Sequence, residues 1–270
     1  MNKKISKKKL LSQNFLKDKA LVSSLVEKSS INKKDTVLEI GPGNGIITTE
    51  LLRKAGYVIA VEKDPDLFEK LLLKYKNRKD IEVHNSDILQ FDLPKYEYKV
   101  FSNIPFSIEG TLVRKLIDHP HNPPVDAYLI MRRDVATRMV GIPKEGLFSL
   151  LHKPWFDLEI FHDFKREDFK PEPKVQSSML RFTKKKKPII DFEMKENYRL
   201  FLEKAFGGGG RIKQNLSPLF SKTQLYRLSS DLGFGLNSIP TQLSFEQWLG
   251  LYNFFIKSVD SKTPTITKKK

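Results

Sequence analysis

The stretch from Val37 to Gly45 constrains the fold more than any other part of the chain. A mostly apolar run, Val37-Leu38-Glu39-Ile40, leads directly into the turn Gly41-Pro42-Gly43-Asn44-Gly45, and the amphipathic stretch Ile46–Lys54 follows it. Glycine lets a backbone bend sharply and approach a ligand without a Cβ in the way. We therefore expect a strand, a glycine-rich ligand loop and a helix, in that order.

The spacing of these glycines distinguishes the loop from two other nucleotide loops. Gly-x-Gly-x-Gly differs from the Gly-x-Gly-x-x-Gly of dinucleotide folds, in which the start of the helix holds a pyrophosphate. The loop also lacks the Lys-Ser/Thr ending of an ATP-binding P-loop. A loop of this kind suits a sulfonium cofactor, which needs no phosphate clamp. On its own, the same pattern also fits an ordinary turn from strand to helix.

Strand-like and helical patterns alternate from about residue 20 to residue 183. The expected strands are Thr36–Ile40, Tyr57–Val61, Ile81–His84, Lys99–Ser102, Val125–Met131, Trp155–Phe161 and Val175–Phe182, with helices at Asp18–Ser30 and Pro65–Tyr75. Such alternation is typical of a parallel sheet wound with helices, which the last two runs can complete as a mixed sheet. The sequence therefore predicts an α/β, Rossmann-like sheet.

Acidic residues follow two of the expected strands. Glu62 comes about twenty residues after the glycine loop, where a carboxylate can accept hydrogen bonds from both hydroxyls of a ribose. Asp87, in Asn85-Ser86-Asp87-Ile88, can accept from the exocyclic amine of an adenine. Ligands of open α/β sheets bind at the carboxyl ends of the strands. We therefore predict that S-adenosylmethionine binds to Gly41, Gly43, Glu62, Asp87 and Ile88.

The fourth expected strand closes in Asn103-Ile104-Pro105-Phe106, the candidate catalytic group. The amine of adenine is a poor nucleophile because its lone pair is delocalised into the ring. The side-chain oxygen of Asn103 and the carbonyl of Ile104, held by Pro105, can accept both amine hydrogens and favour the pyramidal form. Phe106 can stack on the base and face the developing positive charge. The alternative is a proline-terminated strand with a core aromatic.

Basic residues gather at the two ends of the chain. Of the net charge of +16, residues 1–9 contribute five Lys and no acid, residues 10–183 contribute 27 basic and 25 acidic side chains, and residues 184–270 contribute 16 and 7. A near-neutral body flanked by basic segments suits a protein that does chemistry in one part and holds a polyanion with the rest. We expect a basic arm (1–12), a catalytic domain (13–183) and a polyanion-binding domain (184–270).

The last of these segments has helical patterns throughout. Lys184 to Lys187 and Pro188 are interpreted as a hinge, and helices are expected at Lys195–Phe206, Ile212–Phe220, Lys222–Leu232 and Phe245–Ser258, with a break at Gly207–Gly210. Ser221 precedes Gln224, and Ser244 precedes Gln247, at the capping-box spacing. We therefore predict a smaller all-helical C-terminal domain.

Several classes of protein are excluded by what the sequence lacks. The chain has no cysteine, which excludes disulfide scaffolds and cysteine-ligated metals, and its five histidines lack ligand spacing, so we expect no metal. No apolar run approaches the ~18 residues of a membrane span, and none follows Lys9 as a signal peptide requires. We expect a cytoplasmic monomer with no membrane partner.

Five motifs in sequence order resemble those of the ribosomal RNA adenine-N6 dimethyltransferases. They are Ser12-Gln13-Asn14-Phe15-Leu16, Glu39 to Gly45, Ser86-Asp87-Ile88-Leu89, Asn103 to Phe106, and Pro171-Glu-Pro-Lys-Val175-Gln-Ser177. The family includes Erm-type enzymes, which modify large-subunit RNA and confer macrolide–lincosamide–streptogramin B resistance, and KsgA-like enzymes of the small subunit. Asn-Ile-Pro-Phe and the tail from Pro240 to Trp248 look more Erm-like, since the KsgA type usually has Asn-Leu-Pro-Tyr.

The resemblance implies roles for individual residues. It implies cofactor contacts at Asn14, Leu16, Gly41, Glu62, Asp87 and Asn103, and contacts with the target base at Asn103 and Phe106. Two positions depart from the family pattern: Phe106 replaces the commoner Tyr, and Gly207–Gly210 stands where relatives often carry basic residues.

The expected partner is ribosomal RNA, 23S in the Erm-type interpretation, with its adenine in a loop or flipped out of a duplex. Phe164 and Phe169 are interpreted as core residues rather than as a second stacking face. Two other functions stay open beside the KsgA-like one. A DNA adenine methyltransferase generally needs a sizeable recognition domain, and fewer than ninety residues follow Thr183. A non-catalytic RNA-binding protein would not need the Asn-x-Pro-aromatic group.

Overall fold

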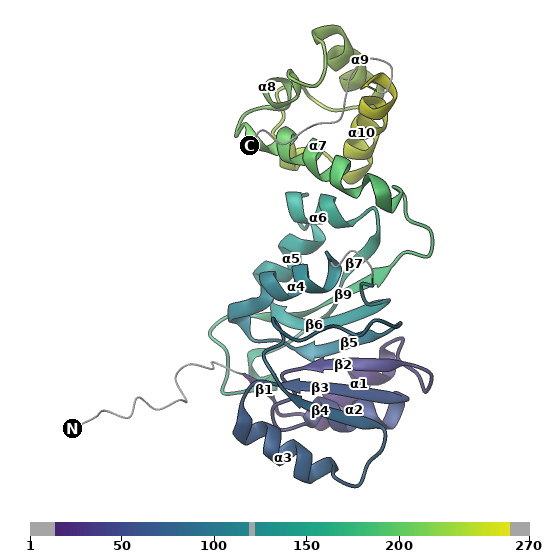
Figure 1. Cartoon of the computed structure of the whole chain (residues 1–270). Helices are drawn as coiled ribbons and strands as arrows, with labels where there is room; N and C mark the ends of the chain where they lie inside the picture. The colour runs from purple at the N-terminus through teal and green to yellow at the C-terminus, as the bar shows by residue number, and fades with distance from the viewer. Residues whose placement is uncertain (1–13, 119–121, 260–270) are drawn as a thin grey trace, which may run out of the picture. The chain divides into compact units, whose positions relative to one another are not determined.

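The computed structural model describes residues 14–118 and 122–259, and the expected basic arm lies outside these ranges. Contacts between residues divide the chain into two compact units (Figure 1). The first runs up to Ala136 and resumes from Glu159 to Lys184, and the second combines Thr137–Leu158 with the chain from Lys185 onward.

The central sheet has the strand order β4-β3-β2-β5-β6-β9-β7. Its strands are β2 (Thr36–Ile40), β3 (Tyr57–Glu62), β4 (Ile81–Asn85), β5 (Lys99–Asn103), β6 (Asp126–Arg132), β7 (Phe156–Asp163) and β9 (Ser177–Lys184). The β2–β3, β3–β4, β2–β5 and β5–β6 pairs are parallel, and β9 is antiparallel to β6. This is the predicted Rossmann-like sheet, and the strands expected at Trp155–Phe161 and Val175–Phe182 complete it as a mixed sheet.

The order in which successive strands are added to the sheet reverses between β2 and β5. From β2 the chain proceeds outward to β3 and β4, then returns to the other side of β2 to form β5 and proceeds to β6. In open α/β sheets, ligands bind outside the carboxyl ends of the strands at such a switch point. Gly41 follows β2 and Asn103 ends β5, so both lie at this point.

Helices cover the sheet on both faces. The first three are α1 (Lys19–Lys28), α2 (Ile46–Lys54) and α3 (Pro65–Tyr75), and all contribute to one apolar cluster with residues of β2, β3, β5 and β6. Crossovers between parallel strands are right-handed, so α4 (Glu109–Ile117), which joins β5 to β6 in the opposite direction, covers the other face. A further helix, α5 (Arg133–Val140), follows β6 directly.

Aspartate caps fix the start of two of these helices. The carboxylate of Asp18 accepts hydrogen bonds from the N–H groups of Ala20 and Leu21 at 2.8 and 3.2 Å. Asp64 accepts from Asp66 N–H at 2.9 Å, and Pro65 occupies the first helical position, where its missing N–H costs nothing.

A second sheet of two short strands joins distant parts of the first unit. In it, β1 (Phe15–Leu16) pairs antiparallel with β8 (Phe169–Lys170). Phe164 and Phe169 are only 6% and 1% exposed and belong to the apolar cluster, which confirms their interpretation as core residues.

The second unit consists of helices around an aromatic core. They are α6 (Leu147–His152), α7 (Lys195–Gly207), α8 (Ile212–Leu216), α9 (Lys222–Leu232) and α10 (Phe245–Val259). Trp248 is fully buried, donates from Nε1 to the Pro240 carbonyl at 3.2 Å and packs edge-on against Phe201. Between Lys185 and Val259 the described chain contains helices and no strand, as predicted.

Residues 137–158 join the second unit, although the predicted boundary assigns them to the first. The reason is aromatic packing, since the Trp155 ring lies 5.9 Å from that of Tyr198 and 6.3 Å from that of Phe192, measured between centroids. The first unit ends at Lys184, one residue after the predicted end of the catalytic domain.

The glycine run Gly207–Gly210 packs closely against α8. A Cβ on Gly208 would lie 2.4 Å from Oδ1 of Asn215, and one on Gly210 would lie 2.4 Å from Oε1 of Gln214. The amide of Asn215 in turn donates to the Ala205 carbonyl at 2.8 Å. The run therefore makes a tight connection between α7 and α8.

The helix expected at Ile212–Phe220 ends earlier, at Leu216. Pro218 has no N–H to donate, and Leu219 N–H bonds the Leu216 carbonyl at 2.9 Å, which tightens the chain into a turn. Among the residues that the structure describes, no helix is long and apolar enough to cross a bilayer.

Candidate active site

The glycine loop after β2 depends on backbone conformations that favour glycine. Gly45 has φ +72° where it caps α2, and Gly43 has φ +58°. A Cβ on Gly43 would lie 2.4 Å from Cε1 of Phe15, so the loop also packs directly on β1. Gly43 is therefore held by two constraints, its positive φ and the Phe15 ring.

Glu62, at the end of β3, is bound to the same loop. Its side chain is 1% exposed, Oε2 accepts from Gly43 N–H at 2.9 Å, and Oε1 accepts from Asp64 N–H at 2.9 Å. Each carboxylate oxygen can accept a further hydrogen bond. The protein therefore orients this carboxylate at the carboxyl edge of the sheet with accepting capacity left over.

A cleft opens beside Glu62 at the ends of the strands. Among its lining residues are Gly41, Glu62, Asp87, Ile88 and Pro105, and it encloses about 630 Å³ including open solvent. Four of these five, all but Pro105, are predicted cofactor residues, so one cleft brings four of the predicted residues together.

Asp87 has two partners in this cleft. Lys63 Nζ lies 2.7 Å from its Oδ2, and Leu89 N–H donates to its Oδ1 at 3.0 Å. These bonds, with that to Lys63 the larger cause, hold the pKa of Asp87 below its usual range. Asp87 is thus a carboxylate acceptor at neutral pH.

A second, smaller cavity, of about 300 Å³ including open solvent, contains the Asn-Ile-Pro-Phe corner. It is lined by Asn14, Phe15, Gly41, Asn103, Ile104, Pro105 and Phe106. Gly41 and Pro105 line both this cavity and the larger cleft. The two spaces therefore adjoin at the switch point of the sheet, so that groups bound in each can meet there.

Backbone contacts fix the corner from both sides. The Asn103 amide donates from Nδ2 to the Asn14 carbonyl at 2.7 Å, and Ile104 N–H donates to the Ile130 carbonyl at 3.2 Å. Ser102 Oγ donates to the Ile40 carbonyl. Within the described residues, Asn103 Oδ1 receives no hydrogen bond. The donor end of this amide is therefore anchored and its acceptor end is available.

Glu109 and Arg132 support the corner from α4 and β6. Glu109 is 3% exposed and accepts from the backbone N–H of Arg132 at 2.6 Å and from its Nε at 3.1 Å. Burial raises the pKa of Glu109, and the bonds to Arg132 oppose that rise. This pair fixes the end of β6, two residues beyond the Ile130 carbonyl that holds Ile104.

Glu39, in β2, carries the most perturbed carboxyl near the glycine loop. It is 1% exposed, and its carboxyl lies beside Thr48 without a hydrogen bond of normal geometry among the described residues. Burial raises its pKa to about 8, and the neighbouring Thr48 opposes that rise. The sequence gives no indication of this raised pKa, because Glu39 looks there like any other acidic residue near the end of an apolar strand.

Two predicted cofactor residues, Leu16 and Gly43, line neither space. Leu16 is 5% exposed and belongs to the apolar cluster, while Gly43 binds Glu62 through its backbone. Their contacts with a cofactor stay predictions. Lys63, Ser107 and Ile108 also line the cleft, and no motif in the sequence indicates them. Their only signal is position, since each lies within two residues of a selected residue.

No group of three or more His, Asp or Glu side chains in the described part of the chain is arranged to hold a metal ion. The site instead offers oriented acceptors in the cleft, and an amide oxygen with an aromatic ring in the adjoining cavity. Such an arrangement suits transfer of a small group from a nucleoside-like ligand to a planar base.

Comparisons with known proteins agree on one family. The model of the ribosomal RNA adenine dimethylase family matches residues 4–257. A ribosomal RNA adenine N-6-methyltransferase of Limosilactobacillus reuteri is 32% identical over 259 residues, covering 94% of this chain and 98% of that protein. A ribosomal RNA small subunit methyltransferase A of Caldanaerobacter subterraneus subsp. tengcongensis is 29% identical, covering 91% and 96%.

A solved structure is similar over almost the same length. The crystal structure of the 23S rRNA methyltransferase ErmE superposes with a TM-score of 0.83 at 27% identity, covering 90% of this chain and all of that one. The likeness therefore extends through both compact units.

Proposed function

The chain belongs to the ribosomal RNA adenine dimethylase family of S-adenosylmethionine-dependent methyltransferases, and we propose that it methylates N6 of one adenine in 23S ribosomal RNA. The modification is dimethylation, and its consequence is resistance to macrolides, lincosamides and streptogramin B. Two observations support the 23S target. One is the similarity to ErmE, and the other is the Asn-Ile-Pro-Phe sequence of the corner, which looks Erm-like. The protein acts as a monomer, and a ribosomal RNA substrate places it in the cytoplasm.

The residues of the cleft fit the cofactor. Glu62 is a carboxylate already oriented by two N–H groups, which suits the two hydroxyls of a ribose, and Asp87 is an acceptor for the amine of its adenine. Asn14 and Gly41 line the adjoining cavity, toward the reacting end. S-adenosylmethionine supplies an electrophilic methyl group when it is bound.

One observation carries the proposal: the cleft beside Glu62 and the smaller cavity at the Asn-Ile-Pro-Phe corner adjoin at Gly41 and Pro105. A target adenine in the smaller cavity presents its amine to Asn103 Oδ1 and to the Ile104 carbonyl, and both accept its hydrogens. This draws the nitrogen toward the pyramidal, nucleophilic form. Phe106 stacks on the base, and its ring faces the positive charge that develops on nitrogen.

Positioning supplies most of the rate enhancement in this mechanism. Holding two reacting groups in line can contribute about 7–11 kcal/mol. A methylated amine bearing a positive charge is strongly acidic and loses its proton to water, so the chain needs no general base. An adenine paired in a duplex cannot reach this cavity, so the target lies in a loop or is flipped out.

A KsgA-like activity on the small subunit is the second candidate. The observation that favours it is the 29% identity with a ribosomal RNA small subunit methyltransferase A, close to that with the Erm-type structure. Both candidates use the same corner and the same cofactor. They differ in the RNA that each recognises.

Tritiated S-adenosylmethionine tests both candidates against three substrates: protein-free large-subunit RNA, assembled small subunits and duplex DNA. We expect label in the large-subunit RNA, and two methyl groups on one adenine by mass spectrometry. Label in small subunits alone would establish the KsgA-like activity. Label in no substrate would favour a non-catalytic RNA-binding protein.

The resistance phenotype needs a separate test. A susceptible bacterial host expressing the chain is expected to grow at raised concentrations of a macrolide, a lincosamide and a streptogramin B. The Asn103→Ala variant serves as the control, because it removes the acceptor for the target amine. Equal growth with both proteins, or with neither, would contradict the proposed consequence.

A further inference from the structure

The helical unit contains a pocket that the proposed methyl transfer does not use. It opens between α8 and α9 and encloses about 570 Å³ including open solvent. Its apolar base is formed by Phe220 and Leu225, which are 5% and 3% exposed, together with Leu236. Tyr226 stands in the wall with about half of its surface, 52%, open to solvent.

Two lysines complete the wall. Lys213 Nζ lies 5.9 Å from the centroid of the Tyr226 ring, and Lys222 lines the pocket from the first position of α9. Neither lysine forms an ion pair with any residue that the structure describes. The pocket therefore offers an exposed aromatic face with two cations that have no acidic partner in the described chain.

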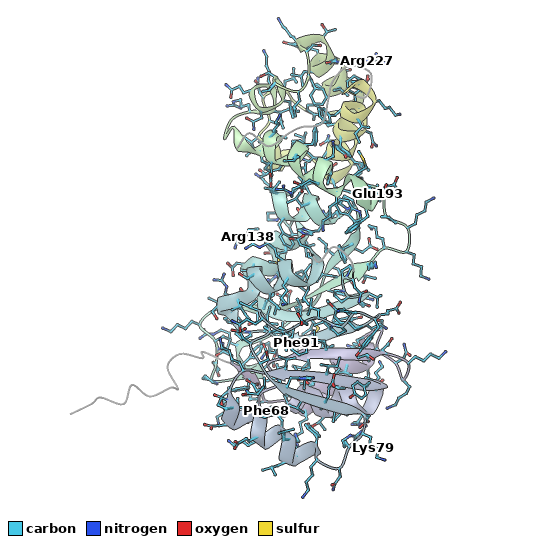
Figure 2. The ribbon with its side chains drawn as sticks, viewed as in Figure 1. Phe68, Lys79, Phe91, Arg138, Glu193 and Arg227 are labelled. Carbon is cyan, nitrogen blue, oxygen red and sulfur yellow. The ribbon has the colours of Figure 1, made fainter. Side chains whose placement is uncertain are left out.

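The segment of sequence around the pocket is also positively charged. Residues 204–230 contain five basic side chains and no acidic one; the five are Lys204, Arg211, Lys213, Lys222 and Arg227. The first acid beyond this segment, Asp231, pairs with Arg227, which Figure 2 labels on α9. A ligand of this pocket therefore carries negative charge.

An apolar base, an open aromatic face and adjacent cations match one chemical class, a nucleotide with an unstacked base. Single-stranded nucleic acids bind by stacking bases on aromatic side chains while lysines neutralise the flanking phosphates. An acidic peptide would also satisfy Lys213 and Lys222, but it has no planar group for Tyr226 and the apolar base beneath it.

We infer that the pocket between α8 and α9 binds one unpaired nucleotide of the RNA substrate, with its base on Tyr226 and its phosphates on Lys213 and Lys222. This inference rests on the proposed function, in that the RNA is the one the enzyme modifies. The pocket belongs to the helical unit, and the cofactor cleft belongs to the sheet unit. The contact adds affinity and specificity without taking part in methyl transfer.

The test measures binding of the full-length protein to protein-free large-subunit RNA. Tyr226→Ala is expected to lower the affinity roughly 5- to 150-fold, the equivalent of ~1–3 kcal/mol per stacked base. Tyr226→Phe keeps the stacking face and is expected to stay within about threefold of the wild type. Lys213→Gln and Lys222→Gln are each expected to reduce the slope of log affinity against log salt by about 0.7, the contribution of one single-strand phosphate.

Controls separate a lost contact from a lost fold. Lys257→Gln removes the same charge from an exposed position on α10 outside the pocket, and it is expected to change affinity much less than Lys213→Gln. Each variant must keep the thermal midpoint and the S-adenosylmethionine affinity of the wild type. Ultraviolet cross-linking of RNA carrying 4-thiouridine, followed by peptide mapping, is expected to label the peptide that contains Tyr226.

The outcomes distinguish this inference from the proposed function. Wild-type protein that methylates RNA, together with a Tyr226→Ala variant of equal RNA affinity, would overturn the inference and leave the function intact. Variants that bind free RNA normally but lose binding only to assembled subunits would instead assign the pocket to a ribosomal protein. Wild-type protein that neither binds nor methylates any RNA would overturn the proposed function itself.

Discussion

The ammonium of Lys63 lies 2.7 Å from Oδ2 of Asp87, and both residues line the cleft at the carboxyl edge of the sheet. The side chain of Lys63 is 65% exposed and that of Asp87 is 25% exposed. In the cofactor-binding role that we propose for Asp87, the adenine amine and the lysine ammonium therefore use the same carboxylate.

Replacing Asp87 should weaken cofactor binding more than replacing Lys63 does. An exposed ion pair is worth about 0–1 kcal/mol, so Lys63→Met should change S-adenosylmethionine affinity at pH 7.5 by no more than about fivefold. Asp87→Ala removes a charged acceptor and should weaken binding by about 10- to 100-fold. Isothermal calorimetry measures both. A larger loss with Lys63→Met than with Asp87→Ala would show that the lysine is the cofactor contact.

The pH dependence of binding gives an independent check on the same pair. Lys63 lowers the pKa of Asp87, so the wild-type carboxylate stays ionised to lower pH than it would alone. In Lys63→Met the pKa rises toward its ordinary value. Cofactor affinity should therefore begin to fall at a higher pH in this variant than in the wild type as the solution is acidified. If cofactor affinity fell over the same range of acidic pH in both proteins, this role of Lys63 would be contradicted.

Glu62→Ala should abolish measurable cofactor binding. It removes the acceptor proposed for the ribose and also releases the Gly43 and Asp64 N–H groups, each bonded to it at 2.9 Å. A loss of at least about 150-fold is expected from two charge-assisted hydrogen bonds of ~1.5 kcal/mol or more each. Glu69→Ala, at an exposed position on α3, is the matched control and should bind normally. Unchanged affinity in Glu62→Ala would remove the cofactor assignment from this cleft.

The sheet could be predicted from the sequence because β3 and β6 are largely apolar runs and the other strands carry shorter apolar stretches between helical patterns. Each of the seven expected strands occurs within two residues of its predicted bounds. The bounds of α3 and α9 agree with prediction, and caps at Asp64 and Ser221 explain why. Buried parallel strands and capped helices carry local signals that depend little on the rest of the chain.

The remaining features depend on contacts between distant residues. Phe15 and Lys170 pair in strands of only two residues, which have no periodicity to detect. The ion pair of Lys63 with Asp87 and the bond from Asn103 to the Asn14 carbonyl span 24 and 89 positions along the chain. The sequence predicted the candidate residues of the site, but the first contact depends on β3 pairing with β4, and the second on the chain before β1 lying beside the end of β5.

Asn103→Asp separates two roles of this side chain. Aspartate keeps an acceptor for the target amine but loses the Nδ2 donor that holds the Asn14 carbonyl at 2.7 Å. Asn103→Ala loses both. Methylation should fall by about 10²- to 10³-fold in Asn103→Ala, the usual cost of removing a transition-state hydrogen bond. Asn103→Asp should retain more of it, measured as initial rates with tritiated cofactor. Equal rates in the two variants would make the Asn14 contact, rather than the acceptor, the essential one.

Removal of residues 1–9 from the basic arm should weaken RNA binding without changing cofactor affinity. Residues 1–9 contain five Lys and no acid. Each lysine that neutralises a phosphate contributes about 0.7–0.9 to the slope of log affinity against log salt. A chain lacking these residues should therefore bind RNA less tightly with a flatter salt dependence, measured by filter binding from low to high salt. An unchanged slope would show that the arm contacts no phosphate.

Glu39 should make the folded state less stable as the pH rises. Its pKa is raised from 4.5 to about 8, so at intermediate pH the folded protein keeps a proton that the unfolded chain has released. The stabilisation is complete below about pH 4.5 and is lost progressively up to about pH 8. Glu39→Gln carries no such proton, so the difference in unfolding free energy between wild type and variant should decline across this range. Urea unfolding at pH 5, 6.5 and 8 measures that difference, with exposed Glu69→Gln as the control. A constant difference would mean that Glu39 titrates alike in both states, and that its burial is relieved by a contact with its carboxylate form.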